Sequence, residues 1–254
     1  MVRTAAALTA LVIGAGMMSA AVPGDALAKE PAKHAKSKAA KKKPAKPKAP
    51  ELPQNIASLA DWVRSSDDNG DKPFIIVDKA AAVVAVFDAK GKLLGSDAAL
   101  VGSAEGDNSA PGVGDRELSD IPMEDRTTPA GRFIGGFGPA AGAQEVLWVD
   151  YDNAISLHPV ITSNPTEKRL DRLKSKTPDD NRITHGCINV PTRFYSKIVR
   201  PAFAKDPGVF YILPDSKPLI EVFPNYYLET LLRAQKASQT TPAPTEQPDP
   251  SRQL

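Results

Sequence analysis

The predicted sheet begins in residues 74–101, which read FIIVDKAAAVVAVFDAKGKLLGSDAALV. Two short runs in this stretch, 74–77 and 83–87, are rich in the β-branched and aromatic side chains that favour strands. Residues 89–92, Ala-Lys-Gly-Lys, have the composition of a hairpin turn and lead into a third strand over 93–101. The stretch therefore predicts a fold built on short strands.

Other parts of the chain extend this pattern. Further strands are predicted over 132–137, 145–150, 154–158 and 208–213, and helices over 55–65, 165–176, 191–204 and 225–235. Proline is frequent, 24 of 254 residues, which suits strands and loops more than a helical bundle. We expect a mainly β fold, a sandwich or barrel-like sheet with a few peripheral helices.

Charge is unevenly distributed along the chain. The net charge is +2, but residues 29–50 hold nine lysines and one acid, so residues 51–254 carry −6. Residues 1–28 combine Arg3, an apolar stretch and a small-residue site at Ala26-Leu27-Ala28, which predicts a secretory signal peptide; an uncleaved anchor is the alternative. We therefore expect an exported protein of the periplasm or cell envelope.

Composition divides residues 29–254 into three parts. Residues 29–50, made of Lys, Ala and Pro, predict a disordered linker, and residues 236–254 a disordered tail. The linker is a solvated spacer or binds an anionic envelope surface; behind an export signal, nucleic acid is not the expected partner. Residues 51–235 remain as the folded body.

The cysteine count limits the chemistry. One cysteine excludes an internal disulfide and a cysteine-rich zinc site, and three histidines leave little for a transition-metal cage. A lone cysteine is often a small buried hydrophobe, but exported proteins seldom keep an unpaired thiol without use. Cys187 also has His185 two residues away, and His158 ends a predicted strand. This combination favours a reactive thiol.

These residue types together predict acyl transfer. A thiolate is the reactive form of cysteine, and a nearby imidazole can take the thiol proton and return it to a leaving amine. Gly186 lets the backbone approach a ligand closely, and successive N–H groups over 185–187 can hold an oxyanion. A thioester intermediate on Cys187 uses all of these groups.

Two motifs resemble a known family. Residues 184–189, Thr-His-Gly-Cys-Ile-Asn, resemble the Ser/Thr-His-Gly-Cys-x-Asn/Arg signature of the L,D-transpeptidase catalytic (YkuD-like) domain. Residues 128–133, Thr-Pro-Ala-Gly-Arg-Phe, resemble that family's Thr-Pro-x-Gly-x-Phe segment, and the resemblance covers about 73–214. It implies a mainly β bacterial cell-wall enzyme without a metal or cofactor. It also implies that carbapenem-type inhibitors acylate Cys187.

The resemblance assigns roles to individual residues. Cys187 is the expected nucleophile and His158 the general base and acid. His185 matches the signature histidine and shapes the cysteine loop. The carbonyl of Pro159 is in the position that orients the base in the family.

The remaining assignments concern the loop and the substrate. Gly186 and the Cys187 N–H are expected to hold the oxyanion, while Thr184 and Asn189 brace the loop or touch the substrate. Arg182 is a candidate for binding a stem carboxylate or, equally, an exposed side chain.

Two segments, 102–127 and 160–182, are longer than the family pattern, and both flank the predicted site. The leading hypothesis is L,D-transpeptidation, in which a tetrapeptide stem of peptidoglycan is transferred through a thioester to an amine, forming 3-3 cross-links. The alternative is hydrolysis, by an L,D-carboxypeptidase or by an amidase that cuts peptidoglycan or a protein–peptidoglycan link. A wall-binding module without catalysis is the third.

Overall fold

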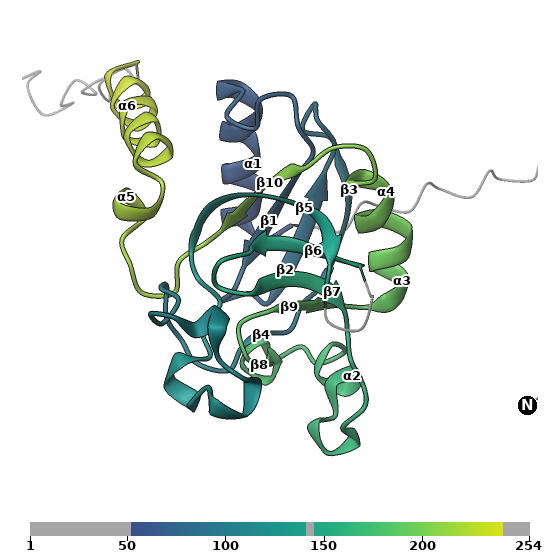
Figure 1. Cartoon of the computed structure of the whole chain (residues 1–254). Coiled ribbons are helices and arrows are strands. Elements are labelled where there is room, and N and C mark those ends of the chain that lie inside the picture. The colour runs from purple at the N-terminus through teal and green to yellow at the C-terminus, as the bar shows by residue number, and fades with distance from the viewer. Residues whose placement is uncertain (1–51, 141–144, 241–254) are drawn as a thin grey trace, which may run out of the picture. The chain divides into compact units, whose positions relative to one another are not determined.

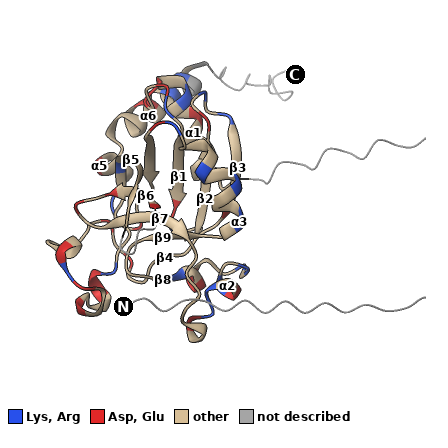
Figure 2. Ribbon diagram, turned by 45° about the vertical axis from the view of Figure 1, so that its right-hand side comes forward, with Lys and Arg blue, Asp and Glu red and all other residues tan. Residues whose placement is uncertain are grey.

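The computed structural model describes residues 52–140 and 145–240 (Figure 1). The proposed signal peptide, the lysine-rich linker and most of the proposed tail lie outside these residues. Within them, the strands are drawn almost entirely tan in Figure 2, whereas charged residues lie mostly on helices and loops. No helix in the described part of the chain has the length and apolar character needed to cross a membrane.

The architecture is mainly β, as predicted. One sheet contains eight strands in the order β3-β2-β1-β10-β5-β6-β7-β9, and a second pairs β4 with β8. The strand bounds are β1 Phe74–Asp78, β2 Val83–Phe87, β3 Leu93–Ala98, β4 Val101–Gly102, β5 Gly131–Pro139, β6 Glu145–Asp150, β7 Ile155–Pro159, β8 Arg182–Thr184, β9 Ile188–Val190 and β10 Gly208–Ile212. The predicted hairpin is present as the antiparallel pair β2–β3.

The large sheet is nearly closed. Its two outermost strands are β3 and β9, yet Leu100, which follows β3, bridges Asn189 within β9. Both backbone hydrogen bonds of this bridge form, from Leu100 N to Asn189 O at 2.8 Å and from Asn189 N to Leu100 O at 2.9 Å. Closure removes exposed sheet edges, and here it also brings β9 and the end of β4 together.

The centre of the sheet is buried on both faces. β1 and β10 run parallel, with Ile75 opposite Phe210, and every residue of both strands is buried. Continuous apolar runs of this kind are typical of parallel strands covered on two sides. One face packs on helix α1, and the other on a helical run over 192–202.

The helices that cover the sheet follow from their apolar spacing. α1 (Gln54–Ser66) buries Ile56, Leu59 and Val63 at intervals of three and four residues and ends at Asp67, which has a left-handed φ of 54°. The predicted helix over 191–204 consists of α3 (Thr192–Phe194), a π-helical turn (Tyr195–Val199) and α4 (Arg200–Ala202).

Other segments differ from the expectation. The predicted helix over 165–176 contains only a 3-10 turn and the four-residue α2 (Arg169–Arg172), because Leu170 is half exposed and supplies no buried anchor. Short strands β8 and β9 were not predicted. Residues 102–127 hold three 3-10 turns and no long strand or helix, as expected of a loop. α5 (Leu219–Val222) precedes α6 (Pro224–Thr240), which extends past the predicted end at residue 235.

Candidate functional site

Strands β7 and β9 bring the predicted site residues together. They run parallel, with Leu157 opposite Ile188 and His158 opposite Asn189. Cys187 therefore lies level with Ser156, and their side-chain atoms Sγ and Oγ are 3.6 Å apart. The sulfur also contacts the carbonyl oxygen of Ala154 at 3.5 Å. Cys187 is free and partly buried.

A compact turn presents the thiol. The Thr184 hydroxyl donates to the Cys187 carbonyl at 2.6 Å and accepts from the Gly186 N–H at 3.1 Å. Thr128 is the first residue of the second motif, residues 128–133. Its hydroxyl donates to the Gly186 carbonyl at 2.7 Å. The two sequence motifs are thus joined directly, and both support the backbone on either side of Cys187.

Gly186 is required by geometry. Its φ is 126°, and a Cβ at this position would lie 2.7 Å from the Thr127 carbonyl oxygen and 2.8 Å from Cδ1 of Ile155. The first conflict involves backbone, which cannot rotate away as a side chain can. The turn before the nucleophile therefore depends on the absence of a side chain.

We expect Gly186→Ala to lower the free energy of unfolding by about 2–4 kcal/mol, because strain and overpacking add. It should also slow alkylation of Cys187. The matched control is Gly112→Ala, where φ is 68° but no atom lies within 4 Å of the added Cβ. That variant should show only the cost of a left-handed residue, about 1–2 kcal/mol. Urea unfolding measures both, and equal losses would contradict the steric argument.

His158 is held through both ring nitrogens. Nδ1 lies 2.8 Å from the carbonyl oxygen of Pro159, which can only accept, so Nδ1 carries the proton. In the neutral ring Nε2 is then an acceptor and lies 3.1 Å from the side-chain amide nitrogen of Asn189; this contact is broken when Nε2 gains a proton. Arg169 of α2 donates to Oδ1 of the same amide at 2.7 Å and so fixes its orientation. The Pro159 carbonyl contacts this ring, and its role in orienting a catalytic base remains a prediction.

The electrostatics of the thiol and the imidazole are coupled. Burial acts to raise the pKa of Cys187, but a hydrogen bond from His158, the charge on that ring and Ser156 outweigh it and lower the pKa. Burial likewise acts to lower the pKa of His158, but hydrogen bonding to Cys187, the thiolate charge and the Pro159 carbonyl raise it. Each group stabilises the charged form of the other, which favours a thiolate–imidazolium pair.

His185 has different surroundings. Burial and the positive charges of Arg126 and Arg169 lower the pKa of His185, which favours the neutral ring. Cys187 is not among the groups that shift the pKa of His185. The structure therefore pairs the thiol with His158, and the part that His185 plays remains a prediction.

The other predicted residues are placed as follows. The Gly186 N–H already bonds Thr184, which leaves the Cys187 N–H as the remaining candidate donor for an oxyanion. Arg182 donates to Asp215 at 2.8 Å, so its role in binding substrate stays untested. In the described part of the chain, no three His, Cys, Asp or Glu side chains are grouped to hold a metal ion.

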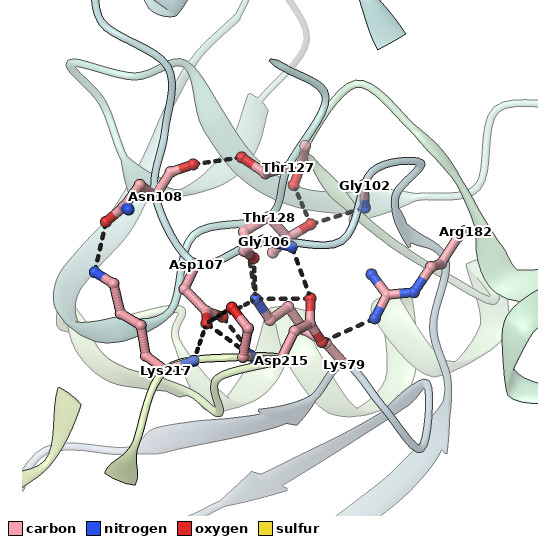
Figure 3. Close-up of polar contacts among 12 residues, drawn as sticks. Lys79, Gly102, Gly106, Asp107, Asn108, Thr127, Thr128, Arg182, Asp215 and Lys217 are labelled. Atoms are coloured by element: carbon pink, nitrogen blue, oxygen red, sulfur yellow. Dashed lines mark hydrogen bonds and ion pairs between the residues drawn. The ribbon is translucent and has the colours of Figure 1, made fainter. Parts of the chain in front are cut away.

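A buried ionic cluster supports the turn from behind (Figure 3). The side chain of Lys79 is fully buried, and its ammonium donates to Asp107 at 2.8 Å, to the Gly106 carbonyl at 2.6 Å and to the Thr128 carbonyl at 2.9 Å. Asp215 lies 3.2 Å from the same ammonium. Lys79 is therefore connected to the cysteine turn by two hydrogen bonds in series: Lys79 donates to Thr128, and Thr128 donates to Gly186, the residue before Cys187.

Two cavities are each lined by a residue that contacts the sulfur of Cys187, Ser156 in the first and Ala154 in the second. The first, of about 710 Å³, is lined by Ser156 and His158 and by residues of the helical run over 192–202. The second, of about 700 Å³, is lined by Ala154, by Asp115 of the loop 102–127, and by the paired rings of Trp148 and Tyr151. Both volumes are in the range of small-molecule sites.

Three residues that contact or support the site were not predicted from the sequence: Ser156, Arg169 and Lys79. Strand alternation places Ser156 on the same face as His158, and this signal was available. Arg169 lies in a charged run without a distinguishing pattern, although the segment was noted as flanking the site. Lys79 follows a buried strand, where nothing in the sequence separates a buried lysine from an exposed one.

Comparison with known proteins found no matching family model and no matching curated protein. Similar solved structures include the catalytic domain of an L,D-transpeptidase from E. faecium, at 16% identity and a TM-score of 0.32, covering 56% of this chain and 98% of that one. Another is the helical cell shape determining protein Pgp2 (K307A mutant) from Campylobacter jejuni, at 16% identity and a TM-score of 0.37, with 74% and 66% covered. A third is the L,D-transpeptidase LdtMt1 in complex with imipenem, at 13% identity and a TM-score of 0.31, with 56% and 58% covered.

Proposed function

We propose that the protein is a cysteine acyltransferase of the L,D-transpeptidase type that acts on peptidoglycan peptide stems. The observation that carries the proposal is that the parallel strands β7 and β9 bring His158 and Cys187 together, where each shifts the pKa of the other toward its charged form. Around this pair, the turn over 184–187 and the two cavities supply a presented nucleophile and room for substrates.

The proposed reaction follows from this geometry. The sulfur of Cys187 attacks the carbonyl carbon of the donor stem, and the peptide bond to the leaving amine breaks. The proton on His158 passes to that amine, which leaves a thioester and a neutral imidazole. An incoming amine then attacks the thioester, and the carbon–sulfur bond breaks. His158 takes the proton of the amine and Cys187 leaves as a thiolate, which restores the starting pair. The Cys187 N–H is the proposed donor to the oxyanion in both halves.

Two cavities, each lined by a residue that contacts the sulfur, favour transfer, because transfer needs room for both a donor and an acceptor. Hydrolysis by an L,D-carboxypeptidase or an amidase is the second candidate. It is motivated by Arg169, since the segment 160–182 reaches His158 through Asn189 and can alter how an acceptor approaches. Purified muropeptides separate the two functions: dimeric products support transfer, and shortened monomers support hydrolysis.

The acyl-enzyme is tested with a carbapenem. We expect incubation of the purified protein to add the mass of the inhibitor, with the adduct mapped to Cys187. The Cys187→Ala variant should gain no mass under the same conditions. Folded protein whose mass stays unchanged would refute the proposed thiol acyl chemistry.

The place of action is part of the proposal. A substrate in the cell wall requires a protein in the periplasm or cell envelope, and the sequence of residues 1–28 fits export. The lysine-rich residues 29–50 would then meet an anionic envelope surface or act as a spacer.

A further inference from the structure

The side-chain amide of Asn189 connects Arg169 to His158. Asn189 lies in β9 and is 1% exposed, and its backbone is fixed by two hydrogen bonds with Leu100. Its Oδ1 accepts from Arg169 at 2.7 Å, and its Nδ2 lies 3.1 Å from Nε2 of His158. The side chain of Arg169 is only 12% exposed and also pairs with Glu167, so the guanidinium is itself held in place. A continuous series of hydrogen bonds therefore runs from α2 to the imidazole.

The donors in this series determine the protonation of His158. A guanidinium can only donate hydrogen bonds, so the amide atom that faces Arg169 must be the oxygen. The amide nitrogen then faces Nε2, and because an amide NH2 group only donates, Nε2 must accept and carry no proton. The single ring proton is on Nδ1, toward the Pro159 carbonyl. Arg169 thus selects the neutral ring, whereas the reversed amide would present its oxygen to a protonated Nε2.

Charge acts in the same direction as the amide. Burial and the positive charge of Arg169 act to lower the pKa of His158, while Cys187 and the Pro159 carbonyl act to raise it, and the second influence is the larger. Cys187 therefore favours the imidazolium, and Arg169 opposes it.

Other titratable side chains lie near the ring or the guanidinium: Glu167, His185, Glu145 and Arg200. Glu167 pairs with Arg169, and Glu145 pairs with Arg200 at 2.9 Å on the wall of the cavity that His158 lines. The pKa of His185 is lowered, which favours its neutral form. These pairings leave Cys187 and Arg169 as the charged groups that act on the His158 ring in opposite senses.

We propose that Arg169 is a positioning residue that limits the reactivity of Cys187: by fixing the Asn189 amide it keeps the resting His158 ring neutral until that contact breaks. Arg169 lies in the segment 160–182, which is longer than the family pattern, so the limit is supplied by an extension of this chain. The inference rests on the proposed function for the role of the thiolate–imidazolium pair, and it deepens that function by adding regulation. Displacement of α2 would free the amide to turn and the ring to gain its proton.

The first test titrates His158 in the absence of the thiol. In the full-length protein carrying Cys187→Ala, NMR of isotopically labelled histidine gives the pKa of the His158 ring. Arg169→Met removes the donor at similar side-chain length, so the amide can turn its oxygen toward Nε2. The pKa of His158 should rise by about one pH unit, the effect of a hydrogen bond gained by a charged group. Asn189→Asp keeps an acceptor for Arg169 but presents a carboxylate oxygen to Nε2, and should raise the pKa at least as far.

The thiol supplies the second readout. With Cys187 in place, both variants should move the pH midpoint of iodoacetamide alkylation downward, because a protonated ring stabilises the thiolate. The control is Arg172→Met. Arg172 lies in the same helix but donates to the carbonyls of Glu167 and Asp180, at 2.8 and 2.6 Å. It should give the parent pKa and the parent midpoint. Unchanged or opposite shifts in Arg169→Met and Asn189→Asp, or an equal shift in Arg172→Met, would overturn the inference.

The two proposals fail in different ways. If both shifts occur but the unmodified Cys187 forms no adduct with a carbapenem, the proposed function fails and the role of Arg169 stands. If the adduct forms but the shifts are absent, the role of Arg169 fails and the function stands.

Discussion

Replacing Lys79 with methionine is expected to lower the free energy of unfolding by roughly 3–5 kcal/mol, the loss seen when one partner of a buried ion pair is removed. The ammonium is fully buried with the carboxylates of Asp107 and Asp215, whose side chains are 1% and 6% exposed. Methionine fills a similar volume but leaves two buried carboxylates with only Arg182 to balance them. It also leaves the carbonyls of Gly106 and Thr128 without their donor.

The matched control is the same substitution at Lys90. Lys90 also pairs with an aspartate, Asp71, at 2.6 Å, but these side chains are 81% and 80% exposed. An exposed pair contributes little, so Lys90→Met should leave the urea midpoint of unfolding nearly unchanged. Urea unfolding of both variants measures the difference. Similar losses would contradict the view that burial makes the Lys79 cluster important.

Acid should lower the free energy of unfolding of the parent protein by protonating Asp107 in the same cluster. Burial acts to raise the pKa of Asp107, but the Lys79 ammonium and the backbone N–H groups of residues 215–217 lower it well below its usual range. A carboxylate with a depressed pKa stabilises the fold above the unfolded pKa of about 3.9, and this contribution is lost as the pH falls below that value. Lys79→Met should therefore make unfolding less sensitive to acid in that range.

His158→Gln is expected to reduce the rate of Cys187 acylation by about 10²–10⁴-fold, the usual contribution of a general base. Glutamine keeps a polar side chain but cannot form an imidazolium. Since His158 lowers the pKa of the thiol, its removal should also move the pH midpoint of iodoacetamide alkylation upward, toward the ordinary thiol value of about 8.5. Stopped-flow acylation by a carbapenem and a pH series of alkylation measure the two effects.

His185→Gln is the control. The groups that shift the pKa of His185 are its burial, Arg126, Arg169 and Glu167, and Cys187 is not among them. We expect this variant to keep the parent alkylation midpoint and to lose less than about tenfold in acylation rate. The reverse ranking would assign the base to His185.

The fold class was predictable because its strands are short apolar runs separated by turn residues. Phe74–Val77 and Val83–Phe87 read as strands and are strands, and α1 follows from the spacing of Ile56, Leu59 and Val63. Hydrophobic periodicity did not predict β8 and β9, because each has only three residues. These strands are stabilised by long-range pairing rather than by local preference. Over 165–176 the sequence predicted a longer helix than the structure contains. Helix-forming residues without buried apolar anchors form only the four-residue α2 there.

The candidate site was predictable where a motif is local. Thr184, Gly186 and Cys187 are neighbours in sequence, and their turn is a local structure. His158 was predicted to lie near the thiol because it ends a strand. The β7–β9 register places it opposite Asn189, two residues after Cys187. Arg169 and Lys79 act across long sequence separations, through Asn189 and Thr128, and no spacing rule links such residues. Their contribution depends on tertiary packing, which a single sequence does not specify.

The position of β10 also dictates the order in which the molecule can assemble. β10 is the last strand in sequence, yet it lies between β1 and β5 and pairs with both. Until residues 208–212 are available, strands β1–β3 and β5–β7 form two separate hairpin groups that share no direct pairing. A nascent or translocating chain therefore cannot complete the sheet early. For the export proposed from residues 1–28, such a delay would keep the polypeptide threadable through a narrow pore until nearly all of it has passed.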